Sequence, residues 1–83
     1  MTAKVMKIEK RKSVYGGDFY YLFCKNIGTG KSYRSCLSSK MGNFQRWRVV
    51  IDKFNKNDRE VVLDGLIIIG KGLIDADSMI VVK

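Results

Sequence analysis

The chain has 83 residues, with 16 lysines and arginines against eight aspartates and glutamates, which gives a formal net charge of +8. This length predicts one domain, residues 1–83, with a small core, because a chain of this size buries only about 60–65% of the surface that it exposes when unfolded. The chain contains no histidine, which excludes imidazole bases, histidine metal ligands and the nucleophiles that rely on a neighbouring imidazole. We therefore expect a small basic binding protein that is not an enzyme and uses no cofactor or metal ion.

Membrane insertion and secretion are not expected. The aliphatic run at residues 66–69 has only four members, far short of the roughly 20 residues that span a membrane. Residues 1–4 lack the apolar stretch of a signal peptide. The hydrophobic content of 46% is too high for a disordered basic tail. We expect a folded cytoplasmic protein with no membrane partner.

Positive charge and aromatic rings share the same part of the chain. Residues 1–59 carry 14 basic and four acidic side chains, a net charge of +10, whereas residues 60–83 carry two and four, a net charge of −2. All the aromatic residues precede residue 55: Tyr15, Phe19, Tyr20, Tyr21, Phe23, Tyr33, Phe44, Trp47 and Phe54. Cations neutralise phosphates and rings stack on bases, so the combination favours a nucleic-acid surface. A solvated lysine-rich face over an aromatic core is the alternative.

Three strands are expected first in chain order. They cover residues 4–14, 19–26 and 31–37, with glycine turns at residues 16–18 and 28–30. In the first strand Met6 and Ile8 point to one side, and Lys7, Glu9 and Arg11 point to the other.

The second hairpin has a definite register if residues 28 and 29 form its tight turn, because opposed residue numbers then sum to 57. One face holds the uncharged pairs Tyr20 with Leu37, Leu22 with Ser35, and Cys24 with Tyr33. The other face holds Phe19, Tyr21, Phe23, Lys25, Ser32, Arg34 and Cys36. A charged face is not buried without partners, so the second face is expected outside. Cys24 and Cys36 then lie on opposite faces and stay as free thiols, as in reduced cytoplasmic proteins.

A helix is expected after the third strand, with Ser38 and Ser39 as its cap. Apolar residues follow at steps of three and four: Met41, Phe44, Trp47, Val50, Ile51 and Phe54. Residues 55–58 end the helix, and the β-branched residues within 48–51 leave a strand as the alternative. Trp47 lies on the apolar stripe and is expected in the core, with base stacking as its alternative role.

The remaining residues predict two more strands. Residues 60–69 form the fourth, with a bend or bulge at Gly65, and residues 73–82 form the fifth, interrupted near residues 75–78. The fold class is therefore mainly β: a small five-stranded OB-like barrel with one helix between strands 3 and 4. An SH3-like small barrel is the structural alternative.

Two motifs that suggest enzymes are better explained as turns. Residues 28–32 resemble the end of a phosphate-binding P-loop, but residue 25 is lysine where the motif needs glycine, and a strand pattern follows where it needs a helix. Asp75 and Asp77 have no third carboxylate nearby and are expected to cap backbone groups of a turn.

Two segments resemble the very small single-stranded DNA-binding proteins of bacteriophages. They are Tyr15-Gly16-Gly17-Asp18-Phe19-Tyr20-Tyr21-Leu22-Phe23 and Gly70-Lys71-Gly72-Leu73-Ile74-Asp75-Ala76-Asp77-Ser78. The resemblance implies stacking by Phe19, Tyr21 and Phe23, with Tyr15 beside them, and phosphate contacts by Lys10, Arg11, Lys12, Lys25 and Arg34. It also implies a homodimer and, for a phage-encoded protein, the host cytoplasm. The chain departs from many single-strand binders in ending with residues 80–83, which are apolar and then basic rather than acidic.

The sequence therefore predicts a sequence-nonspecific single-stranded DNA-binding protein of DNA replication or recombination. It would act by phosphate neutralisation and base stacking, without breaking a bond. An RNA-binding OB domain of the cold-shock type is one alternative, because such domains also stack bases on aromatic strand residues. A small protein-interaction module, with the rings as interface anchors, is the other.

Overall fold

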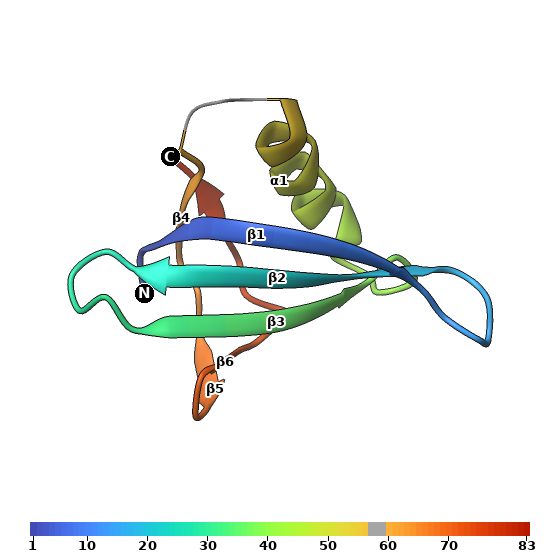
Figure 1. The fold of residues 1–83 in the computed structure, drawn as a ribbon, viewed down its shortest axis with the longest axis horizontal. Helices are drawn as coiled ribbons and strands as arrows, with labels where there is room; N and C mark the ends of the chain where they lie inside the picture. Colours follow the sequence, from blue (N-terminus) through green and yellow to red (C-terminus); the bar gives the residue numbers. More distant parts are fainter. Residues whose placement is uncertain (57–59) are drawn as a thin grey trace.

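An antiparallel meander of three strands forms the first half of the chain, as the glycine turns predicted. The structure, a computed structural model, describes residues 1–56 and 60–83. Its elements are β1 (Ala3–Lys12), β2 (Asp18–Asn26), β3 (Ser32–Ser38), α1 (Phe44–Lys56), β4 (Val62–Asp64), β5 (Ile68–Gly70), β6 (Leu73–Ile74) and β7 (Val81–Val82). Figure 1 shows α1 beside β1, and β5 and β6 beyond β3. The expected helix end at residues 55–58 lies partly outside the described residues.

The β2–β3 register is the predicted one. Tyr20 lies opposite Leu37, Leu22 opposite Ser35, and Cys24 opposite Tyr33. The connection is wider than a two-residue turn, because the Gly30 N–H donates to the Asn26 carbonyl at 2.9 Å. The Asn26 side chain accepts from the N–H groups of Gly28 (2.8 Å) and Thr29 (3.0 Å). The longer loop is still centred on residues 28 and 29, so opposed residue numbers of β2 and β3 still sum to 57. The residues that resemble a P-loop therefore connect two strands.

A bulge in β1 overturns one sequence prediction. The pairing of β1 with β2 shifts between Val5 and Lys7, which leaves Met6 as the extra residue, half exposed at 50%. Met6 was predicted to share the face of Ile8, but Ala3 and Val5 occupy the core instead. The physical reason is that a bulge inserts one residue and restarts the alternation of faces.

The helix packs its apolar stripe onto the sheet. Trp47 and Val50 are fully buried, which confirms the helix over the alternative strand and the core role of Trp47. The Trp47 indole Nε1–H donates to the Ala76 carbonyl at 2.7 Å, and the Asn43 side-chain amide donates to the same carbonyl at 2.7 Å. These bonds attach the start of α1 to the segment between β6 and β7.

The predicted helix cap is wrong. The helix begins at Phe44, and the preceding residues form turns in which the Met41 N–H donates to the Ser38 carbonyl at 3.1 Å. The Ser39 hydroxyl accepts from the Asp18 N–H at 3.2 Å, so it closes the end of the β2–β3 hairpin. Serine side chains cap turns as well as helices, which is why these serines misplaced the helix start.

Each of the last two predicted strands is divided into two short ones. The first break lies at Gly65, as expected, where φ is +84° and a Cβ atom would lie 2.6 Å from the Met79 carbonyl oxygen. At the second break the Asp75 carboxylate accepts from the Asp77 N–H at 3.0 Å, and the Ser78 hydroxyl donates to the Asp75 carbonyl at 2.6 Å. This confirms the prediction that the two aspartates belong to a turn.

The result is a mainly β fold with one helix between the third and fourth strands, as predicted. The strand count is seven and not five, because of the two breaks. The strands form one curled, open sheet in the order β5-β6-β3-β2-β1-β4-β7, a half-barrel compatible with an OB-like fold. β4 pairs with β1, and β6 pairs with β3 in parallel. Across residues 1–56 and 60–83, no helix is long and apolar enough to cross a membrane.

Candidate nucleic-acid interface

The surface of the β1–β3 meander that faces away from the core is called the outer face here. Strand alternation buries Leu22 and Cys24 of β2 and Tyr33, Ser35 and Leu37 of β3. The residues that alternate with them therefore form the outer face, together with their β1 partners: Lys4, Lys7, Glu9, Arg11, Phe19, Tyr21, Phe23, Lys25, Ser32, Arg34 and Cys36. This is the face that the sequence predicted to lie outside.

Three rings form a row along β2 on the outer face. Phe19, Tyr21 and Phe23 are half-buried, so they are less exposed than free surface rings. The rings of Phe19 and Tyr21 meet edge to face, with centroids 5.4 Å apart and planes at 90°. The Arg11 guanidinium lies 5.9 Å from the centroid of the Tyr21 ring. Neighbouring side chains thus orient the rings before any ligand arrives.

Two shallow hollows lie on either side of Arg34. One, of about 270 Å³, is lined by Tyr21, Arg34, Ser35, Cys36 and Leu73. The other, of about 160 Å³, is lined by Phe23, Ser32, Tyr33, Arg34 and Gly72. Each hollow therefore combines a ring of the β2 row with the same guanidinium. A flat ligand with an adjacent negative charge fits this arrangement of groups.

The outward cations of β1 are paired with a carboxylate. Lys7 Nζ lies 2.6 Å from Glu9 Oε1, and Arg11 Nη2 lies 3.1 Å from Glu9 Oε2. Hydrogen bonds from Lys7 and then Arg11 lower the pKa of the Glu9 carboxyl below its ordinary value. Glu9 is therefore ionised at neutral pH and cancels one of the two positive charges.

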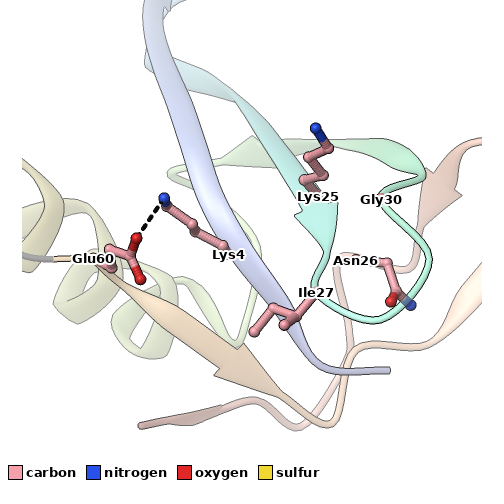
Figure 2. A pocket seen from close by; sticks show the side chains of 6 residues that line it. All are labelled: Lys4, Lys25, Asn26, Ile27, Gly30 and Glu60. Atoms are coloured by element: carbon pink, nitrogen blue, oxygen red, sulfur yellow. Dashed lines mark hydrogen bonds and ion pairs between the residues drawn. The ribbon is translucent and has the colours of Figure 1, made fainter.

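The outward cations of β2 and β3 have no such partner. Within residues 1–56 and 60–83, no ion pair involves Lys25 or Arg34. Lys25 lies opposite Lys4, whose Nζ is 2.7 Å from Glu60. Figure 2 shows Lys4 turned toward Glu60 and Lys25 apart from that ion pair; all three side chains line one pocket of about 270 Å³. Among the cations of the outer face, Arg34 and Lys25 are thus the ones that no described carboxylate neutralises.

The structure divides the predicted interface residues into two groups. Phe19, Tyr21, Phe23, Arg11, Lys25 and Arg34 share the outer face. Lys10 lies opposite Tyr20 on the other face, and its Nζ is 3.5 Å from the Asp18 carboxylate. Lys12 lies on the same side as Lys10 by alternation. Tyr15 lies in the loop between β1 and β2, 90% exposed and outside the paired strands that carry the ring row.

Five outer-face residues, Lys4, Lys7, Glu9, Ser32 and Cys36, were absent from the predicted interface, and so was Leu73 beside them. Lys7 and Glu9 could have been included, because their alternation with Arg11 is visible in the sequence. Cys36 was already assigned to this face as a thiol. Leu73 joins the hollow beside Tyr21 only because β6 pairs with β3. A contact between segments this far apart in the chain has no local sequence signal.

The two cysteines are free and differ in environment. Cys24 is buried in the core, and this burial raises the pKa of its thiol to about 11. Cys36 is exposed in the hollow beside Tyr21. The hairpin separates them onto opposite faces, as predicted.

The described part of the chain holds no group of three or more cysteine, aspartate or glutamate residues that could bind a metal ion. The chemistry of the outer face is therefore that of rings, guanidinium and ammonium groups, one carboxylate and one thiol. No protein-family model, curated protein or solved structure matches this chain.

Proposed function

We propose that this chain is a sequence-nonspecific single-stranded DNA-binding protein that acts in DNA replication or recombination. The observation that carries the proposal is the row of Phe19, Tyr21 and Phe23 next to the guanidinium of Arg34, which forms no ion pair with any residue of 1–56 or 60–83. Bases stack on the rings while Arg34 and Lys25 bind the phosphates. Because every base has a flat face, stacking tolerates any sequence.

The curled, open sheet supports this proposal because it is compatible with an OB-like fold whose fourth and fifth strands are each interrupted. β4 continues the sheet from β1, and β6 continues it from β3, so the last segments approach both sides of the meander. OB-folds bind oligonucleotides on the face of their central strands. The outer face lies on the corresponding strands here.

A single strand fits the outer face better than a duplex does. The rings of Phe19, Tyr21 and Phe23 are half-buried and lie in a row along β2, so they offer stacking surfaces to successive bases. Bases in a duplex are already stacked on each other, and they reach the rings only after unpairing. The proposed ligand is therefore a strand with unpaired bases.

The test is a fluorescence-anisotropy titration with labelled oligo(dT), the same length of duplex and oligo(rU), at several salt concentrations. Three to five phosphate contacts predict a log–log salt slope of about −2 to −3.5 for the single strand. We expect weaker binding to the duplex. A slope near zero, or equal affinity for both forms of DNA, contradicts the proposal. Competition between oligo(dT) and oligo(rU) separates the DNA-binding function from the RNA-binding alternative.

A protein-interaction module is the second candidate, and exposed aliphatic residues favour it. Ile67, Ile68 and Ile69 are 53%, 47% and 63% exposed, next to Leu73 in the β5–β6 hairpin. Apolar surface of this kind marks contact sites for proteins. Binding through it would survive high salt, unlike binding to phosphates.

The homodimer remains a prediction that sedimentation of the wild-type chain and an Ile68→Lys variant would test.

A further inference from the structure

We propose that Glu9 is a built-in competitor for phosphate, whose carboxylate holds Lys7 and Arg11 until a nucleic-acid phosphate displaces it. This inference rests on the proposed function and adds one residue that sets its affinity. It concerns the β1 side of the outer face, where the cations are already paired in the free protein.

The geometry of Glu9 supports this role. Its position between Lys7 and Arg11 in the alternation of β1 places all three side chains on the outer face. Each carboxylate oxygen serves a different cation, Oε1 at 2.6 Å from Lys7 and Oε2 at 3.1 Å from Arg11. A phosphate also offers two negative oxygens to two cations. Glu9 therefore occupies the position that a phosphate of the bound strand would take.

The same contacts connect Glu9 to the ring row. Glu9 lies opposite Tyr21 on β2, and the Arg11 guanidinium lies 5.9 Å from the centroid of the Tyr21 ring. A base that stacks on this part of the ring displaces Arg11, which then leaves Glu9 and becomes available to the adjoining phosphate. The arrival of a base and the release of a cation are thereby coupled.

Removal of the carboxylate should raise affinity. The carboxylate of Glu9 neutralises one of the two positive charges that Lys7 and Arg11 bring to this part of β1. In Glu9→Gln both cations are released from the ion pair while the shape of the side chain is kept. The ion pairs are exposed, so their loss should change the melting temperature little.

The experiment compares wild type, Glu9→Gln and Asp52→Asn for binding to labelled oligo(dT) over a range of salt concentrations. Asp52 is an exposed residue of α1, so Asp52→Asn makes the same change in net charge away from the outer face. We expect Glu9→Gln to bind about fivefold tighter at low salt, because its binding no longer breaks the ion pairs of Glu9 with Lys7 and Arg11. Asp52→Asn should change affinity less than about twofold.

The outcomes separate the two proposals. If none of the three proteins binds oligo(dT), the proposed function is wrong. If wild type binds with the expected salt slope and Glu9→Gln gains no more than Asp52→Asn, only the role of Glu9 is wrong.

Displacement can also be observed directly by NMR titration of the Glu9 carboxyl. In the free protein the pKa of this carboxyl lies below its ordinary value, because Lys7 and Arg11 donate to it. In the complex with oligo(dT), the Glu9 carboxyl loses the two cations and gains negatively charged phosphates as neighbours. Both changes should raise its pKa, to above the ordinary value. A pKa that is the same with and without oligo(dT) would overturn the proposal.

Discussion

β1 and β3 flank the same aromatic strand, yet they present their positive charge in different ways. On β1, Lys7 and Arg11 share the carboxylate of Glu9. On β3, Arg34 lies among Ser32 and Cys36 with no acidic side chain in the outward row. The number of cations on a strand therefore does not by itself determine its attraction for an anion, since β1 has two beside one carboxylate and β3 has one with none. The charge available to a ligand depends on whether a carboxylate lies two residues away on the same face.

This comparison assumes that the outer face is free and the inner face is core, and Leu22→Ala tests that assumption with the largest expected effect. Leu22 lies between Tyr21 and Phe23 in the sequence. Its side chain points to the opposite face of β2 and is fully buried. Its truncation should lower the free energy of unfolding by about 2–5 kcal/mol. Chemical denaturation followed by circular dichroism measures this. A variant as stable as wild type would mean that the two faces of β2 are exchanged.

Loss of a ring from the outer face should weaken binding rather than folding. Tyr21→Ala and Phe23→Ala should each lose about 1–3 kcal/mol of binding free energy for oligo(dT), because a base loses its stacking partner. Both rings are only half-buried, so the melting temperatures should fall less than that of Leu22→Ala. If neither variant binds more weakly while both remain folded, stacking is not the mechanism and the protein-interaction module becomes the leading candidate.

Substitution of one arginine on each side tests the comparison itself. Arg34→Gln should lose about tenfold in affinity for oligo(dT), since an unpaired guanidinium contributes its full interaction with a phosphate. Arg11→Gln should lose less, because a phosphate must first displace Glu9 from Arg11. The two titrations are run at the same salt concentration. Equal losses would show that the ion pair on β1 has no effect on binding.

The smallest expected effect is protection of a thiol. Cys36 is exposed beside Tyr21, whereas the pKa of the buried Cys24 thiol is raised to about 11. Iodoacetamide near pH 8 should therefore modify one cysteine in the native protein and both after unfolding. Oligo(dT) should slow the modification of Cys36 severalfold, measured by mass spectrometry. Unchanged modification of Cys36 in the complex would exclude the hollow beside Tyr21 from the binding surface.

The sequence was most informative where the alternation of side chains and the position of the charges left only one way to bury a strand or helix. In the β2–β3 hairpin, only one face can be buried without burying Lys25 and Arg34, and the observed register is the predicted one. The steps of three and four from Phe44 to Phe54 identified α1 for a similar reason. In both elements, residues close together in the chain and the cost of burying a charge decide which face is buried.

The failures have physical causes too. Met6 is apolar, so its sequence context contains no sign that it would be the extra residue of a bulge. Lys10 and Lys12 were assigned to the interface with Arg11 as one basic run, although alternation places them on the other face. The position of Leu73 depends on the pairing of β6 with β3, which is a property of the whole fold. The sequence pattern therefore placed the side chains of the β2–β3 hairpin on the correct faces, but it did not indicate the bulge in β1 or the contact between β3 and β6.

The burial of Trp47 determines what intrinsic fluorescence can report. Trp47 is the only tryptophan, its side chain has no exposed surface, and its indole N–H is bonded to the Ala76 carbonyl. Its emission should follow the separation of α1 from the segment between β6 and β7, which accompanies unfolding. A ligand on the outer face does not touch this ring, so tryptophan emission should stay constant during a titration with oligo(dT). The chain thus contains an internal probe of folding that is separate from binding, and a change in that emission on binding would reveal a rearrangement of the core.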